Sequence, residues 1–149
     1  IMHRVVITGA GAVSSLGMDL SSNFNSLSEG KSGISKIDFL NSDRLSIKIG
    51  GQIKNFNPNS HFSKQERSIY DKFTQFALIA TKQAVSTSGF ELKKDDTSDI
   101  GVILGTAGGG LQTQDENYRQ VYEEGKNRVH PLIVPKLMNN AAASNVSIK

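Results

Sequence analysis

The sequence predicts an α/β fold of which these 149 residues form a part. Residues 4–8 and 100–104 are near-continuous apolar runs rich in β-branched side chains, which is typical of parallel strands covered on both faces. Helical patterns follow both runs. The last helical pattern continues to Lys149 without a glycine or a cap, and two or three strands with four helices make an incomplete layer. We therefore expect residues 1–149 to be cut from a larger domain.

Composition places the chain among ordinary globular proteins. It is 37% hydrophobic and 21% charged, and no apolar run reaches the roughly 20 residues that span a bilayer, which argues against membrane insertion. The net charge of +3 permits an acidic partner, but the basic residues are dispersed and no aromatic-basic motif indicates nucleic-acid binding. The first residues carry no apolar signal-like region, so we expect a cytoplasmic protein.

Cysteine is absent from the sequence. This excludes disulfides, thiolate metal sites and thiol catalysis within these residues. The three histidines, His3, His61 and His130, lack the spacing of metal ligands, and each is interpreted as a surface or loop histidine.

The first part of the chain reads as a strand, a long turn and a helix. Asp19 or Ser21 is suited to cap that helix, and Gly30 to end it. Its expected buried face carries Leu20, Phe24 and Leu27. Residues 47–53 alternate as a further strand, and residues 57–59 form a turn.

Two helices are predicted next, one from Ser63 and a longer one capped by Asp71 and ended by Gly89. The residues of the longer helix expected to face the core are Phe73, Phe76, Ala77, Ala80 and Ala84.

After the strand at residues 100–104, residues 111–124 predict a polar helix whose few apolar contacts are Val121 and Tyr122. Pro135 suits the first turn of a last helix. The pattern of that helix is set by Leu137, Met138, Ala141, Ala142 and Val146.

Gly9 and Gly11 follow a strand and so suggest a dinucleotide-binding turn. Ser14 occupies the position of the third glycine, and no acidic residue ends a second strand about 20 residues later. A nicotinamide or flavin oxidoreductase is therefore a minor alternative. The simpler interpretation is that these glycines permit a tight turn with positive φ.

Five stretches together resemble the β-ketoacyl-acyl-carrier-protein synthases of type II, from bacterial fatty-acid synthesis. They are residues 4–17 (RVVITGAGAVSSLG), 30–34 (GKSGI), 71–77 (DKFTQFA), 101–111 (GVILGTAGGGL) and 131–135 (PLIVP). They occur in the order of the family and span nearly the whole chain. Any one is weak evidence, whereas five in register are specific.

The resemblance implies a thiolase-like, layered α/β/α/β/α fold built from two similar halves, and a homodimer without a cofactor. It implies decarboxylative Claisen condensation, in which a cysteine takes an acyl chain from carrier protein and malonyl carrier protein supplies two carbons. In the family the cysteine follows shortly after the position of Lys149, and two histidines and a lysine come much later. We therefore expect the 149 residues to lack catalytic residues and to be inactive alone.

The resemblance also implies substrate-binding positions within the chain. Those that match the family's acyl tunnel near the dimer interface are Gly108, Leu111, Ile133, Leu137 and Met138. Some members carry a bulky residue where this chain has Gly108, so the glycine implies room for a longer acyl chain. Core or interface packing is an equally good interpretation of the aliphatic residues.

Acidic acyl carrier protein is the implied partner. The nearest equivalents of the family's docking residues are Lys64, Arg67, Lys126 and Arg128, although Ser68 and Ile69 stand where positive residues are common. For each of these charges taken alone, a solvated surface is the better interpretation.

Two further interpretations stay open. The chain could belong to a non-catalytic chain-length factor, which keeps the fold and dimer without the cysteine. It could also be a small, self-contained interaction domain.

Overall fold

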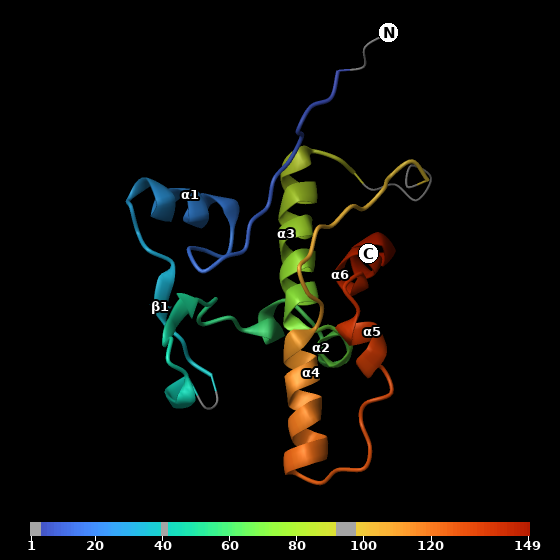
Figure 1. The fold of residues 1–149 in the computed structure, drawn as a ribbon. Coiled ribbons are helices and arrows are strands. Elements are labelled where there is room, and N and C mark those ends of the chain that lie inside the picture. Colours follow the sequence, from blue (N-terminus) through green and yellow to red (C-terminus); the bar gives the residue numbers. More distant parts are fainter. Residues whose placement is uncertain (1–3, 40–41, 92–97) are drawn as a thin grey trace. The chain divides into compact units, whose positions relative to one another are not determined.

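The computed structural model describes residues 4–39, 42–91 and 98–149 (Figure 1). The chain divides into two compact units. The first joins Ile1–Asn57 to Ile79–Glu91, and the second joins Pro58–Leu78 to Leu92–Lys149. All predicted tunnel and docking residues belong to the second unit.

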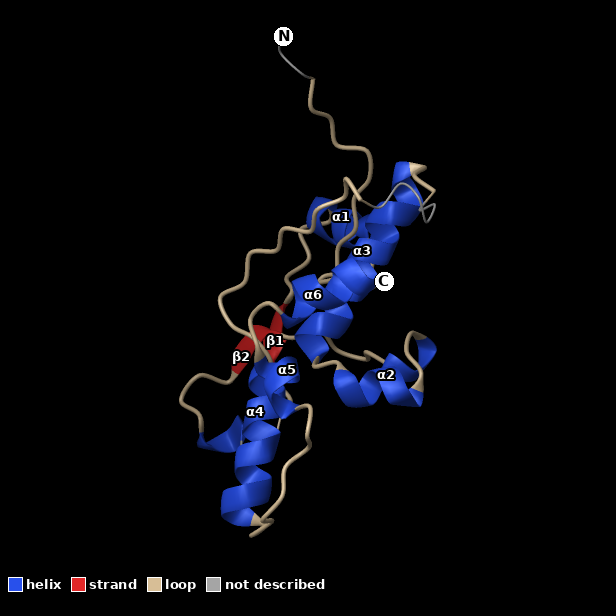
Figure 2. Cartoon of the chain, turned by 90° about the vertical axis from the view of Figure 1, so that its right-hand side faces the viewer, coloured by secondary structure: helices blue, strands red, loops and turns tan. Residues whose placement is uncertain are grey.

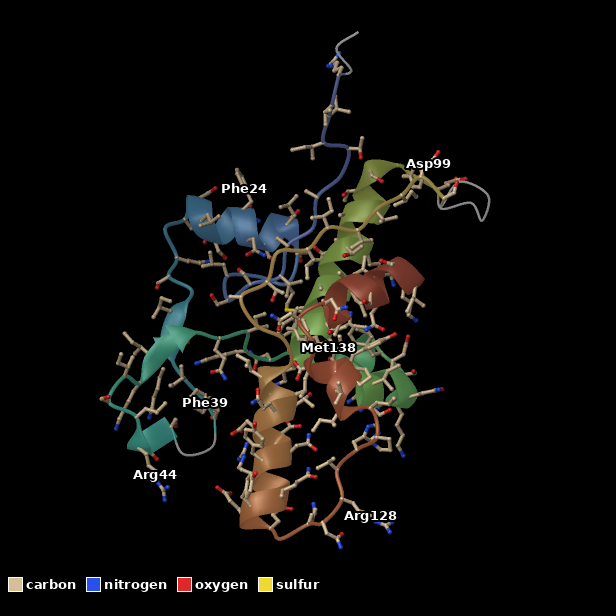
Figure 3. All side chains as sticks on the ribbon, turned by 45° about the vertical axis from the view of Figure 1, so that its right-hand side comes forward. Phe24, Phe39, Arg44, Asp99, Arg128 and Met138 are labelled. Carbon is tan, nitrogen blue, oxygen red and sulfur yellow. The ribbon has the colours of Figure 1, made fainter. Side chains whose placement is uncertain are left out.

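Helix α1 of the first unit, Leu20–Ser28, begins where a cap was predicted. The Asp19 carboxylate accepts a hydrogen bond from the Ser22 N–H at 2.7 Å, and Ser22 Oγ accepts one from the Asp19 N–H at 3.2 Å. This reciprocal capping box fixes the start at Asp19. Gly30, with φ of 67°, follows the helix end. The predicted buried face is wrong, because Leu20, Phe24 and Leu27 are all exposed; Figure 3 shows Phe24 pointing away from α1.

Strands β1, Ile34–Lys36, and β2, Ile49–Gly51, form an antiparallel pair (Figure 2). Ser35 lies opposite Gly50 in this register. The strand predicted at residues 47–53 is thus confirmed in its centre. Its partner β1 was not predicted, because three residues are too short for a periodic signal. Between them lies a 3₁₀ turn, η1, Ser42–Arg44, and another, η2, Pro58–Ser60, opens the second unit.

Helices α2, Lys64–Ile69, and α3, Lys72–Ser88, confirm both predicted starts. Ser63 and Glu66 form a second capping box, and Gly89, with φ of 69°, follows α3. The α3 residues expected in the core are only half-buried. The buried positions of α3 are instead Thr74, Gln75 and Ile79.

The helix predicted at residues 111–124 is confirmed as α4, Leu111–Tyr118, which continues into a π-helical turn, η3, Arg119–Glu123. Tyr122, expected to be one of its apolar contacts, is exposed. The predicted final helix is two helices, α5, Ile133–Leu137, and α6, Ala141–Ile148. Met138 separates them because its backbone is extended, with φ of −58° and ψ of 140°. Pro135 lies in the first turn of α5, as predicted.

The two buried strands predicted at residues 4–8 and 100–104 are wrong for this structure. Both segments lack strand pairing, and Val5 and Ile103 are 92% and 100% exposed. Figure 1 shows residues 4–8 as an extended trace leading toward the N-terminus. A strand requires hydrogen bonds from a neighbouring backbone, and none of the described residues supplies them.

Gly9 and Gly11 have a structural role in the first unit. A Cβ on Gly9 would lie 2.1 Å from the Ala84 carbonyl oxygen of α3, and one on Gly11 would lie 2.0 Å from that of Ala80. The intervening Ala10 N–H donates to Thr87 Oγ1 of the same helix at 3.2 Å. The predicted structural interpretation holds, but its reason was wrong: these glycines permit close approach to a helix, and neither has a positive φ.

Candidate functional site

The glycine turn before α4 packs directly on the end of α5. The Gly110 N–H donates to the Leu137 carbonyl oxygen at 3.0 Å. A Cβ on Gly109 would lie 1.8 Å from that same oxygen, and one on Gly110 would lie 2.5 Å from the Lys136 carbonyl oxygen. Only glycine fits at these two positions, so the sequence Gly109-Gly110 is what lets the turn contact α5.

Gly108 lies beside a side chain of α4. A Cβ added at Gly108 would meet the Leu111 Cδ1 at 3.6 Å, which is ordinary van der Waals contact. Leu111 is itself 68% exposed. The Leu111 side chain therefore covers one side of the space that the glycine leaves, and the other side of Leu111 is open to solvent.

An apolar cleft of about 180 Å³ lies between α4–η3 and α5. Its lining comprises Gln114, Asn117, Tyr118, Val121, Tyr122, Val129, Ile133 and Leu137. Figures 1 and 2 show α5 beside α4. Of the predicted tunnel residues, Ile133 and Leu137 line this cleft, whereas Gly108, Leu111 and Met138 do not. Met138 lies exposed at the junction of α5 and α6 (Figure 3).

Leu137 links four of the five predicted tunnel residues, which are Gly108, Leu111, Ile133 and Leu137 itself. Its carbonyl oxygen contacts the glycine turn that holds Gly108 and precedes Leu111, while Leu137 also lines the cleft with Ile133. An arrangement of this kind offers an apolar chain a surface made of glycine backbone and aliphatic side chains.

The predicted docking residues lie in two places. Lys64 is exposed and Arg67 half-buried on α2, and the buried Arg67 Nε has no hydrogen-bond partner among the described residues. Lys126 and Arg128 are exposed after η3, where Lys126 pairs with Glu124 at 2.8 Å. Figure 3 shows Arg128 pointing outward from its loop. No ion pair joins the two places within the described parts of the chain.

Glu66 supplies the negative charge on α2. Its Oε2 accepts from the Ser63 N–H at 2.9 Å, and its Oε1 lies 2.6 Å from Lys149 Nζ. The hydrogen bond from Lys149, followed by those from Ser63, lowers the pKa of Glu66 to about 2. The same pairing raises the pKa of Lys149. Lys149 therefore neutralises the carboxylate of Glu66, which lies between Lys64 and Arg67 in the sequence of α2.

Side chains that could hold a metal ion do not gather in the described residues. No three histidine, aspartate or glutamate side chains there are placed to hold a metal ion. His61 and His130 are exposed, as predicted for loop histidines, and His130 Nδ1 accepts from the Leu132 N–H at 3.1 Å. His3 lies outside the described residues. None of the described helices is long and apolar enough to cross a bilayer.

Comparison with known proteins decides the family. Residues 2–149 match the family described as "Beta-ketoacyl synthase, N-terminal domain". The chain belongs to this family. It is 36% identical over 145 residues to 3-oxoacyl-[acyl-carrier-protein] synthase 2 of Staphylococcus aureus (strain COL), a match that covers 97% of the chain and 35% of that protein. The chain thus spans about a third of the length of this curated relative.

Solved ketosynthases share the fold. The ishigamide ketosynthase/chain length factor superposes with a TM-score of 0.78 at 20% identity, covering 96% of the chain and 36% of that structure. A ketosynthase solved with its type II polyketide acyl-carrier protein, AntDE:AntF, gives 0.75 at 19% identity, covering 96% and 37%. The predicted thiolase-like fold class is therefore confirmed, and the present chain forms part of it.

One feature of this β-ketoacyl synthase domain was not predicted. Asp71 was expected only to cap α3, and its Oδ1 does accept from the Phe73 N–H at 3.2 Å. Its Oδ2 also accepts from the N–H and the Oγ1 of Thr113 on α4, at 2.8 and 2.6 Å. The two residues are 42 positions apart, so no local pattern indicates the contact.

Proposed function

We propose that the chain is the N-terminal part, residues 1–149, of a 3-oxoacyl-[acyl-carrier-protein] synthase of type II fatty-acid synthesis. The observation that carries this proposal is the family match over residues 2–149, together with 36% identity to a protein of that name. Family membership supports a condensing enzyme, and the identity favours this particular reaction.

In the proposed reaction a cysteine thiolate of the longer parent protein attacks an acyl thioester and releases the carrier thiol. Malonyl carrier protein then loses carbon dioxide, and its enolate carbon attacks the acyl-enzyme. This frees the cysteine and gives a 3-oxoacyl thioester longer by two carbons. The 149 residues contain no cysteine, so they cannot supply the nucleophile and are inactive alone.

We assign the glycine turn and α5 to the acyl-binding site. The packing of Gly109 and Gly110 on the end of α5, and the apolar cleft lined by Ile133 and Leu137, support this assignment. With glycine at position 108, the space beside Leu111 is not filled by a side chain of the turn itself. The parent enzyme is expected to accept long acyl chains for this reason.

We assign carrier-protein docking to Lys64, Arg67, Lys126 and Arg128. Acidic partners are attracted by exposed basic groups, and the pairing of Glu66 with Lys149 removes an opposing charge from α2. The ketosynthase of AntDE:AntF is described in complex with its acyl-carrier protein, which supports this kind of partner. We further propose a cytoplasmic homodimer for the parent protein.

The test is to clone and express the parent open reading frame. We expect an Ala-Cys pair after a Gly-Pro turn beyond residue 149. The purified protein should lengthen the acyl chain of an acyl-[acyl-carrier-protein] by two carbons taken from malonyl carrier protein. Replacement of that cysteine by alanine should abolish elongation. Glutamine at the cysteine position, with no elongation, would instead identify a non-catalytic chain-length factor.

A further inference from the structure

Asp71 is a buried carboxylate at the start of two helices. The residue is 6% exposed, and its carboxylate oxygens accept hydrogen bonds from Phe73 and Thr113. It has no basic partner among the described residues. The N–H groups and the positive dipole ends of α3 and α4 balance its charge instead. Such charge-assisted bonds are about twice as strong as neutral ones.

The same carboxylate lies against the glycine turn. A Cβ on Gly110 would be 3.0 Å from Asp71 Oδ2, and the Gly110 N–H is held by Leu137 of α5. Gly110 immediately precedes α4, and Thr113 is the third residue of that helix. Asp71 therefore joins the beginning of α3, the first turn of α4 and, through Gly110, the end of α5.

We propose that Asp71 is a positioning residue that fixes the glycine turn Gly108–Gly110 and thereby sets which acyl chains the synthase elongates. This rests on the proposed function of the turn in acyl binding. Because Asp71 is buried and both its oxygens accept hydrogen bonds from protein donors, it acts through Thr113 and Gly110 and does not contact the acyl chain.

Three variants of the full-length synthase weaken the contact between Asp71 and Thr113 to different extents. Asp71→Asn replaces one carboxylate oxygen by an NH2 donor, so the donors of Phe73 and Thr113 can no longer all be accepted. Thr113→Val removes only the hydroxyl donor, with nearly the same shape, and keeps the backbone N–H bond to Asp71. Thr113→Ser keeps the hydroxyl. Asp115→Asn is the matched control, because Asp115 is an exposed aspartate of α4 that pairs with Arg119.

The measurement is kcat/KM for a series of acyl-carrier substrates of increasing chain length, expressed as the ratio of long to short. We expect this ratio to change about tenfold in Asp71→Asn, since a 1 Å misplacement of substrate-positioning groups costs up to about 100-fold. A smaller change is expected in Thr113→Val, and none in Thr113→Ser or Asp115→Asn.

A uniform loss of activity at every chain length would show that Asp71 is merely structural and would overturn the proposal. If Asp71→Asn does not fold, the comparison of Thr113→Val with Thr113→Ser decides, and equal ratios in these two variants would also overturn it. Absence of elongation activity in the wild-type protein would refute the proposed function itself. An active wild type with unchanged chain-length ratios in the variants would refute only the role of Asp71.

Discussion

Neighbouring glycines of the turn differ in what surrounds their α-carbons. A Cβ at Gly109 would overlap the backbone of Leu137, whereas one at Gly108 would make normal contact with Leu111. We expect Gly109→Ala to destabilise the full-length protein by about 1–3 kcal/mol, since backbone must move to relieve the overlap. Gly108→Ala should change stability by less than about 0.5 kcal/mol. Unfolding in denaturant measures the stability of both variants. Equal unfolding midpoints for Gly109→Ala and Gly108→Ala would contradict the close packing of Gly109 on Leu137.

The pairing of Glu66 with Lys149 makes stability depend on pH. The pKa of Glu66 is lowered from 4.5 to about 2 in the folded protein, so the ionised form is favoured by folding. This contribution is complete above the unfolded value of 4.5 and is lost as the pH falls toward about 2. The stability difference between wild type and Glu66→Gln should shrink over that range in denaturation at successive pH values.

Lys149 variants provide the control for this pH effect. Lys149→Arg keeps the positive charge and should retain most of the wild-type pH dependence, whereas Lys149→Gln should lose most of it because Lys149 is the largest cause of the lowered pKa. Identical acid profiles for wild type and Lys149→Gln would show that the ion pair is not formed in solution.

At the scale of elements, α2 and the segment after η3 carry the proposed docking charges. The double variant Lys64→Glu/Arg128→Glu should raise KM for acyl-carrier substrates about tenfold, because like charges slow the encounter with an acidic partner. Its kcat should change little, and its KM should depend less on salt. Lys36→Glu, an exposed change on β1 in the first unit, is the control. An unchanged KM in the double variant would reject these docking positions.

Elements with local end signals could be predicted from the sequence. Asp19, Ser63 and Gly89 mark helix ends through hydrogen bonds or backbone angles that involve only the next few residues. The sequence also supported the family through five ordered motifs. The candidate tunnel positions came from that resemblance, and Leu137 proves to contact the glycine turn.

Features that depend on distant contacts could not be predicted. The last helix is divided at Met138, next to Leu137, whose carbonyl oxygen accepts a hydrogen bond from Gly110, 27 positions earlier. The Asp71–Thr113 contact spans 42 positions. The runs at residues 4–8 and 100–104 have strand propensity, but pairing requires a neighbouring backbone.

At the scale of the whole chain, few of the described residues are buried, and most of the buried side chains are polar. The buried apolar residues among those described are Tyr70, Ile79, Ala141 and Ala142. The buried polar residues outnumber them and include Asp71, Thr74 and Gln75, while Val5, Ile7 and Ile103 are more than nine-tenths exposed. Hydrophobic burial is the dominant favourable term in folding, so this distribution predicts weak stability for the 149 residues alone.

We therefore expect the isolated 149-residue chain to lack a cooperative thermal transition. Among the described residues, its two apolar extended segments have no partner strand and the apolar core is small. Circular dichroism melting, with sedimentation to give the mass, makes the measurement. The full-length parent protein serves as the control and should melt cooperatively, since additional strands would cover residues 4–8 and 100–104. A sharp transition of the isolated chain at a monomeric mass would contradict this expectation and would establish a self-contained domain.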